Sequence, residues 1–454
     1  MAIWQLRKGM DRRFRAGHPW VYSNELTVSP KGLEPGAPVE LRDHTGKFLA
    51  RGYGNPNSLI SFRALSRNPE IADPTSTEAL VESLRIAGNL RGVAGLRDLS
   101  HRLCFGEADG LPGLIIDRYR TADAQDQVGP AKNNTGHVPE SLDQGQVFVV
   151  QAHTAGANRW IPQIENVLEK YVRGPEGITP AKKYQAIWDS TSIVIRNDLA
   201  VRKLEGVDEE LPRVLRKAKG IEIADLKNSV ISVAAALGGD PILFHVDLIG
   251  GQKTGFFLDQ AANIELAALR LRFLGKTKVR ILDLCCYVGQ WGTQLARVFR
   301  DAGLKVEVVA VDASSAALEF AKQNIQAQGA QCEILKADVL RDLPQLPDRS
   351  FDIVISDPPA LIKNRKDIPA GTHAYLQLAT QAFRLVKAGG GIVCCSCSSL
   401  LEEESFAQVL AKAGQRNSRT TRWMGRGGQS ADHPFLPEFP EGRYLKGWVG
   451  WVGV

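Results

Sequence analysis

The sequence has no apolar run that approaches the roughly 20 residues of a membrane-spanning helix. Its first residues, MAIWQLRKGMDRRFRAGHPW, also lack the continuous apolar core of a secretory signal peptide. Together these absences predict a cytoplasmic protein that makes no membrane contact. With 44% hydrophobic and 23% charged residues, the composition is typical of a soluble globular protein. A length of 454 residues predicts about two or three domains.

Cysteine is scarce, and the number of cysteines is odd. A reducing compartment favours thiols over a disulfide framework. No histidine lies near the cluster Cys394, Cys395 and Cys397 at the spacing of a zinc site, so we predict no metal centre. The seven cysteines are Cys104, Cys285, Cys286, Cys332, Cys394, Cys395 and Cys397.

A strong excess of charge is absent too, because the net charge is only +6. This mild basic excess permits a polyanionic partner without requiring one. The first 20 positions hold five basic residues beside a single acid, Asp11, interleaved with aromatic ones. Basic groups neutralise phosphates, and aromatic rings stack on bases. An alternative stays open, in which the charges are a solvated edge and the aromatics form a small core. The predicted RNA contacts here are Arg12, Arg13, Arg15 and Trp20.

Turn signals and short β-like runs divide the first half of the chain. Residues 1–72 carry the runs PVELRDHTG, FLARGYGN and LISFRALSR between Gly, Pro and Asn turns, which predicts a small antiparallel barrel. Residues 73–205 open with the helical pattern STEALVESLRIAGNL and predict a central α/β domain. Residues 121–146 are almost free of apolar side chains and predict a mobile surface insertion.

From residue 206 to 454, apolar strands alternate with helical segments. Continuous apolar strands that are covered by helices indicate a parallel, doubly wound α/β sheet. No internal repeat or heptad pattern is evident. The predicted strands are VRILDLCC, KVEVVAVDA, CEILKAD, FDIVISDPP and GGIVCCSCSS.

Ligands of such sheets bind at the carboxyl ends of the strands. The first strand ends in a turn that contains Gly289 and Gly292, the second ends in Asp312, and the third ends in Asp338. A carboxylate after the second strand can accept hydrogen bonds from both hydroxyls of a ribose. Each acid alone also suits a helix cap, but three in register favour a nucleoside. No phosphate-binding loop is present, so we predict the phosphate-free adenosyl ligand S-adenosylmethionine.

The fourth strand ends in SDPPA, where two prolines fix the backbone and direct Asp357 outward. Asp-Pro-Pro after an apolar strand is typical of methyltransferases that act on a planar nitrogen heterocycle. The carboxylate of Asp357 is placed to bind the N3 and N4 edge of a cytosine.

The fifth strand carries the cysteine cluster. Alternation along a strand directs Cys395 and Cys397 to one face and Cys394 to the other. Cys394 and Cys395 lie in an apolar run and are predicted to be buried packing residues. Cys397 lies where the strand leaves the sheet, so it is a candidate nucleophile. A thiolate that adds to C6 of a pyrimidine makes C5 nucleophilic enough to take a methyl group.

The sequence resembles the bacterial class I S-adenosylmethionine-dependent large-subunit ribosomal RNA cytosine-C5 methyltransferases. The resemblance implies an N-terminal PUA-like domain, a central α/β domain and a Rossmann-like catalytic domain, with Cys397 as nucleophile and Asp357 facing the base. It also implies a 23S ribosomal RNA partner, and we consider a homodimer. The matching stretches are GHPWVYSNEL, GEADGLPGLIIDRY, AVRKLEG, GGQKTGFFLDQAAN, LDLCCYVGQWG, SDPPALIKNRKD, CSCSS and DHPFLPEFPEGRYLKG.

Strand register and resemblance together predict the cofactor site, and two motifs depart from the family. The family usually has Lys after Asp-Pro-Pro, where this chain has Ala360, so Lys363 is the expected substitute for RNA contact. It usually reads Tyr-Thr-Gly-Gly-Phe where this chain has Gln290 and Trp291. Uracil-C5 methylation, purine methylation and a non-catalytic assembly role remain alternatives. The expected cofactor residues are Phe256, Gln260, Asp283, Tyr287, Gly289, Asp312, Asp338 and Asp357.

Overall fold

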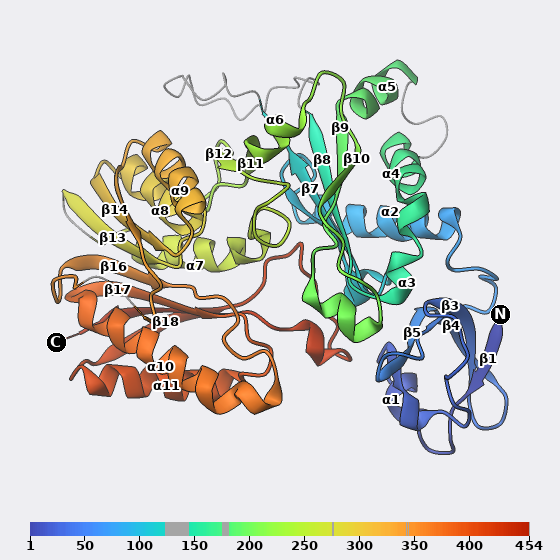
Figure 1. Ribbon diagram of the computed structural model, residues 1–454. Helices are drawn as coiled ribbons and strands as arrows, with labels where there is room; N and C mark the ends of the chain where they lie inside the picture. The colour runs from blue at the N-terminus through green and yellow to red at the C-terminus, as the bar shows by residue number, and fades with distance from the viewer. Residues whose placement is uncertain (123–144, 175–180, 275–276, 342, 344, 454) are drawn as a thin grey trace.

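The computed structural model of the protein describes residues 1–122, 145–174, 181–274, 277–341, 343 and 345–453. The insertion predicted at 121–146 therefore lies almost wholly outside the described residues. Figure 1 shows three parts in chain order, with the N-terminal sheet, the central sheet and the large C-terminal sheet side by side. No helix in these ranges combines the length and the apolarity that crossing a bilayer requires.

The N-terminal part is a five-stranded sheet in the order β1-β3-β4-β5-β2, antiparallel except for the β1–β3 pair. The three strands predicted from turn signals are β3, β4 and β5. Trp4 and Phe14 are buried in its core, as the alternative interpretation of the aromatics expects. The elements are β1 (Ala2–Gln5), α1 (Arg12–Arg15), β2 (Trp20–Tyr22), β3 (Ala37–Arg42), β4 (Phe48–Gly54) and β5 (Ile60–Ser66).

The central part is a five-stranded sheet in the order β10-β9-β8-β7-β6. Helix α2 packs Leu80, Val81 and Leu84 against this sheet at helical spacing, and Ser76 caps it by accepting a hydrogen bond from Ala79 N. The elements are α2 (Thr77–Val93), β6 (His101–Phe105), β7 (Leu114–Arg120), β8 (Gln146–Ala152), α3 (Ala155–Asn158), α4 (Ile164–Arg173), α5 (Ala181–Asp189), β9 (Thr191–Ile195) and β10 (Arg213–Arg216).

A two-stranded sheet links the central part to the third. Strands β11 (Ser229–Val233) and β12 (Ile242–Val246) pair with each other, and Ile231 of β11 forms a bridge to Thr121. Strand β10 continues the central sheet beyond residue 205, so we propose three domains whose second boundary follows β10.

The C-terminal part is a seven-stranded sheet in the order β15-β14-β13-β16-β17-β19-β18. The five predicted strands are parallel, and β19 and β18 extend the sheet antiparallel. One face packs against α7, α8 and α9, and the other packs against α10 and α11 (Figure 1). The elements are α7 (Ala261–Leu271), β13 (Lys278–Leu284), α8 (Gln290–Asp301), β14 (Lys305–Asp312), α9 (Ser315–Ala327), β15 (Gln331–Lys336), β16 (Phe351–Ser356), α10 (Ile368–Leu385), β17 (Val386–Ser396), α11 (Glu403–Arg416), β18 (Thr421–Gly427) and β19 (Lys446–Val452).

Strand order places the site. Chain order reverses at β13, which has β14 on one side and β16 on the other. Such a switch point leaves a crevice beyond the carboxyl ends of the strands. The turns after β13, β14, β16 and β17 therefore meet at one edge of the sheet.

Candidate active site

The turn after β13 is held by the acid that ends β14. Tyr287 N and Ser314 N donate to the two carboxylate oxygens of Asp312, at 2.9 and 2.8 Å. Each oxygen can accept a further hydrogen bond, so Asp312 still has capacity for a ribose. Asp338, after β15, accepts from Leu340 N at 3.0 Å and pairs with Arg341 at 3.5 Å.

The same turn has an unusual backbone. Cys285, Tyr287 and Gly289 all have positive φ angles, 62°, 51° and 76°. This conformation is disfavoured for residues with a side chain and concentrates at functional sites. The Tyr287 hydroxyl donates to Gly255 O at 3.1 Å and accepts from Gln252 N at 2.9 Å. The turn is therefore tied to residues 252–255.

Asp283 is fully buried in β13, with one oxygen accepting from Gly292 N at 3.0 Å. Its other oxygen has no partner among the described residues. Burial raises the pKa of Asp283 to about 8, and the charges of Asp357 and Asp312 add to this shift. Three carboxylates that repel one another fit a cationic ligand. S-adenosylmethionine meets this requirement with an ammonium and a sulfonium.

Asp357 follows β16 and is held by two donors. Gln260 Nε2 lies 2.8 Å from both carboxylate oxygens, and Trp291 Nε1 lies 2.9 Å from one of them. Asn263 in turn donates to Gln260 Oε1 at 2.7 Å. Burial raises the pKa of Asp357 to about 6 in spite of these hydrogen bonds. The group can therefore gain or lose a proton near neutral pH.

The three clustered cysteines have different surroundings. Cys394 and Cys395 are buried on opposite faces of β17, as alternation predicts, and pack with the α10 and α9 sides respectively. Cys397 is only partly buried, and its thiol points to Pro358 O at 3.8 Å. Burial raises the pKa of Cys397 to about 11. Cys397 and Asp357 thus lie on neighbouring turns, and the cysteine is a thiol at neutral pH.

Not every predicted cofactor residue faces the turn. Phe256 is 1% exposed and packs against Phe244 at 5.0 Å between ring centres, so the structure places it in the core behind the site. Gln260 donates to Asp357, and its contact with the cofactor stays a prediction. Gly289 is required where it is, because a side chain there would meet Ala321 Cα at 3.0 Å.

The residues predicted to bind RNA are scattered. Arg13 pairs with Glu25 at 3.3 Å, and Arg15 pairs with Asp11 and with Asp43 at 2.5 Å. Arg12 is exposed on α1, and Lys363 is exposed between β16 and α10.

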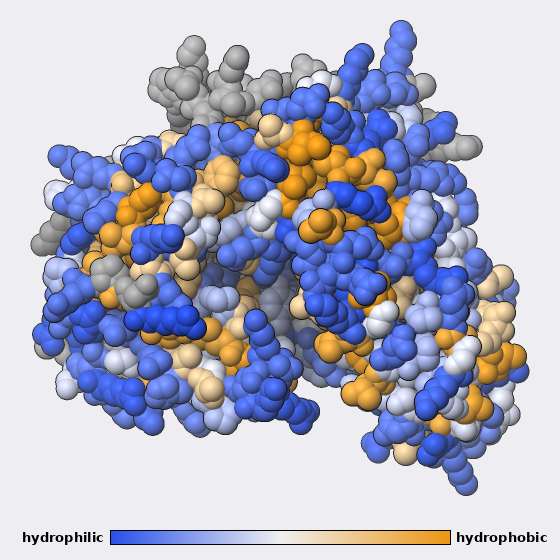
Figure 2. Space-filling view, in the orientation of Figure 1, coloured by the Kyte–Doolittle hydropathy of each residue, from blue (hydrophilic) through white to orange (hydrophobic). Residues whose placement is uncertain are grey.

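Trp20 lies at a junction instead of on an open surface. Its indole donates to Glu107 Oε1 at 2.9 Å, and its ring meets Phe439 edge-on at 4.7 Å. Figure 2 shows a largely hydrophilic face that is hollowed between the lobe of the large sheet and the other two. The structure therefore brings Trp20 to the contact between all three parts.

Sequence reasoning missed four polar residues near Asp357 and Cys397, which are Lys253, Asp259, Trp291 and Tyr444. Asp259 accepts from the Tyr444 hydroxyl at 2.6 Å and pairs with Lys253 Nζ at 3.0 Å. The signal was present, since three of these residues lie in the matching stretches GGQKTGFFLDQAAN and DHPFLPEFPEGRYLKG. Among the described residues no group of three or more potential ligands could hold a metal ion.

Comparisons with known proteins agree with this geometry. A PUA-like domain model matches residues 5–67, and a methyltransferase domain model matches residues 276–435. A Serratia proteamaculans protein named ribosomal RNA large subunit methyltransferase I is 30% identical over 454 residues, 98% of each chain. The chain belongs to the ribosomal RNA large subunit methyltransferase I family. A Photobacterium profundum protein of the same name is 29% identical over 456 residues, with 98% of each chain covered.

Solved structures support the fold of this family member. A Streptococcus mutans SAM-dependent methyltransferase matches with a TM-score of 0.67 at 14% identity, over 99% of this chain and 100% of that one. A methyltransferase complexed with SAH matches with a TM-score of 0.68, also at 14% identity and with the same coverage. The predicted PUA-like and class I methyltransferase folds are confirmed, and so is S-adenosylmethionine as the cofactor of the family.

Proposed function

We propose that the protein methylates C5 of a cytosine in large-subunit (23S) ribosomal RNA through a covalent adduct between Cys397 and C6. The observation that carries the proposal is the pairing of Asp357 and Cys397. They follow the adjacent parallel strands β16 and β17, and the Cys397 thiol reaches the carbonyl of Pro358, the residue after Asp357. The assignment of ribosomal RNA as the substrate rests on the names of the relatives, and the PUA-like domain supports an RNA partner.

The cofactor would lie over the turn after β13. Asp312 would take the ribose hydroxyls, and the free oxygen of Asp283 would accept from the ammonium. Tyr287, Gly289 and Asp338 line the same edge of the sheet. The cofactor supplies an electrophilic methyl group on a sulfonium.

The first step needs a proton to leave Cys397, because its pKa of about 11 leaves little thiolate at pH 7. Asp357 has a pKa of about 6 and is ionised at pH 7, so it can take the thiol proton. It then donates this proton to N3 as the bond between sulfur and C6 forms. The base becomes a neutral enamine whose C5 carries the reactive electron pair.

C5 takes the methyl group, and the C5 proton leaves to a base. The bond between sulfur and C6 breaks as the double bond between C5 and C6 is restored. The N3 proton returns through Asp357 to the sulfur. One proton is released per turnover, and Cys397 ends as a thiol.

The protonation behaviour of Asp357 favours cytosine over uracil. Cytosine N3 is an acceptor and needs a donor, whereas uracil N3 already carries a hydrogen. A carboxyl group whose pKa is raised to about 6 can act as that donor. A purine target would leave Cys397 without a role, and a non-catalytic assembly factor would need neither group.

Nucleoside mass spectrometry tests the proposal. Large-subunit RNA without its native modifications is incubated with the protein and labelled S-adenosylmethionine, then digested to nucleosides. We expect the label in 5-methylcytidine. Label in 5-methyluridine or in a methylated purine would contradict the cytosine assignment, and no transfer to any large-subunit RNA would favour the assembly role.

A further inference from the structure

Lys253 is a cation near the catalytic pair that the mechanism above does not use. Its ammonium lies 3.0 Å from Asp259 Oδ2 and 4.4 Å from the centre of the Phe257 ring. The same carboxylate oxygen accepts from Tyr444, while the buried Oδ1 has no partner among the described residues. The lysine side chain is 42% exposed, so it stands at the open side of the site.

Asp259 lies where the segments of both catalytic groups meet. The next residue, Gln260, holds Asp357. On the other side, Lys446 Nζ donates to Tyr444 O and to Ser398 O, both at 3.0 Å, and Ser398 follows Cys397. The Lys253 ammonium is therefore held at the contact between these two segments.

The charges around Cys397 are unbalanced. Asp357 and Asp259 raise the pKa of its thiol, and Lys253 lowers it. Tyr375, Tyr444 and Lys446 are also near enough for the negative charge of an ionised Cys397 to favour their protonated forms. Lys446 is 6% exposed and donates two of its three N–H groups to carbonyls, whereas Lys253 donates one of its three, to Asp259.

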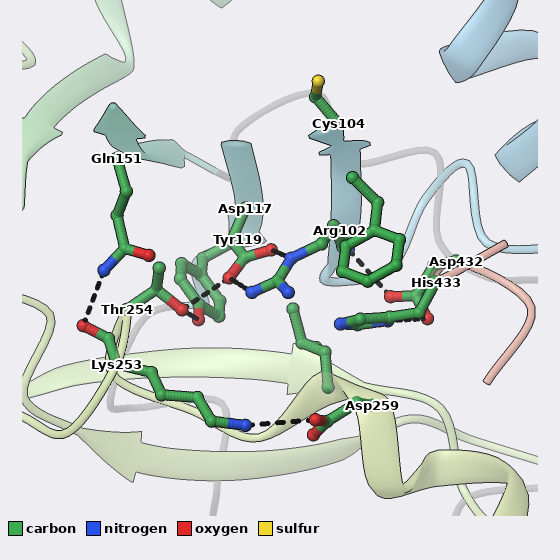
Figure 3. A network of polar contacts seen from close by, with 12 residues as sticks. Arg102, Cys104, Asp117, Tyr119, Gln151, Lys253, Thr254, Asp259, Asp432 and His433 are labelled. Carbon is green, nitrogen blue, oxygen red and sulfur yellow. Dashed lines mark hydrogen bonds and ion pairs between the residues drawn. The ribbon is translucent and has the colours of Figure 1, made fainter. Parts of the chain in front are cut away.

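The central domain fixes the backbone of Lys253, whose φ of 51° is disfavoured for a residue with a side chain. Gln151 Nε2 donates to Lys253 O at 3.3 Å. The Thr254 hydroxyl accepts from Tyr119 and donates to Asp117. Figure 3 shows the side chains of Gln151, Asp117 and Tyr119 extending from the central sheet toward Lys253 and Thr254.

Asp117 has three donors to its carboxylate oxygens, two from Arg102 and one from Thr254. It is fully buried, and Arg102 binds both of its oxygens, at 2.7 and 2.8 Å. Arg102 N donates in turn to Asp432 at 2.8 Å, in the segment that leads to Tyr444. Residues of the central sheet thus contact both the segment of Lys253 and the segment of Asp432 (Figure 3).

We propose that Lys253 stabilises the Cys397 thiolate during attack on C6, and that the central domain positions this lysine through Asp117 and Thr254. The proposal rests on the proposed function, because it needs the sulfur as a nucleophile. The thiol proton still leaves to Asp357, Lys253 keeps its three protons, and no bond to Lys253 forms. The central domain then contributes to catalysis as well as to the architecture.

Alkylation of Cys397 by iodoacetamide tests the lysine directly. The full chain is alkylated from pH 7 to 9 without RNA, and the Cys397 peptide is quantified by mass spectrometry. Lys253→Met should react about three- to tenfold more slowly, because the thiolate fraction below the pKa changes tenfold per pKa unit. Lys253→Arg should keep the wild-type rate, and so should Lys412→Met, which removes an exposed lysine of α11.

Thr254 tests the positioning. Thr254→Val removes only the hydroxyl that contacts Asp117, and it should slow alkylation in the same direction, whereas Thr254→Ser should restore the rate. A wild-type rate in Lys253→Met would overturn the proposal, and slowing by Lys446→Met alone would assign the role to the other lysine. Because the assay contains no RNA, a failure of methyl transfer would contradict the proposed function without altering this result.

Discussion

Cofactor binding should release a proton from Asp283. With a pKa of about 8, this carboxyl is about nine-tenths protonated at pH 7 in the free protein. An ammonium at its free oxygen favours the ionised form and lowers the pKa. If the pKa falls below about 6, binding at pH 7 releases close to one proton.

Titration calorimetry in two buffers of different ionisation enthalpy measures this release. At pH 7 the apparent binding enthalpies in the two buffers should differ by nearly the difference between the two buffer ionisation enthalpies, because nearly one proton passes to the buffer for each cofactor bound. At pH 9 Asp283 is already ionised and releases almost no proton, whereas the cofactor's amino group, which titrates at about 8 when free, takes one up to bind as an ammonium, so the sign of the difference should reverse. Asp283→Asn should bind more weakly and remove the buffer dependence. Equal heats in both buffers for the wild type would refute a protonated Asp283 at the cofactor ammonium.

Three further predictions concern single side chains. Asp312→Ala should weaken S-adenosylmethionine binding by roughly 1.5–3 kcal/mol in calorimetry, the worth of hydrogen bonds to a charged group; unchanged affinity would remove Asp312 from the site. Trp291→Phe removes a donor from Asp357 and should raise its pKa by about one unit, seen as an upward shift of the acidic limb of the pH–rate profile; an unmoved limb would contradict this. Cys394→Ala should cost roughly 1–2 kcal/mol in urea unfolding yet retain turnover, and lost turnover in a folded variant would contradict a packing role.

The catalytic sheet was predictable because its signals are local. Apolar runs such as FDIVISDPP and GGIVCCSCSS are continuous, and parallel strands place their carboxyl ends together. That rule predicts Asp357 and Cys397 on neighbouring turns, and they lie there in the structure. Alternation along β17 also separated Cys394 from Cys395 correctly.

Contacts between distant segments were not predictable. The hydrogen bond from Tyr444 to Asp259 joins residues 185 positions apart, and no periodicity reports such a pair. Trp291 looked like a departure from the family, yet its indole holds Asp357. The basic neighbours of Trp20 in the sequence suggested a base-stacking residue. In the structure its indole donates to Glu107 and its ring packs on Phe439, and both partners are far away in the sequence.

The thiol adduct is the central claim, and trapping tests it most directly. On RNA that contains 5-fluorocytosine, fluorine replaces the C5 proton and blocks release of the sulfur from C6. With S-adenosylmethionine present, the protein should form an RNA complex that survives denaturation, and Cys397→Ser should form none while still binding the cofactor. If Cys395→Ala formed no complex and Cys397→Ala still formed one, the nucleophile would be Cys395 and not Cys397. Methylation of cytosine by Cys397→Ala at the wild-type rate would contradict covalent catalysis itself.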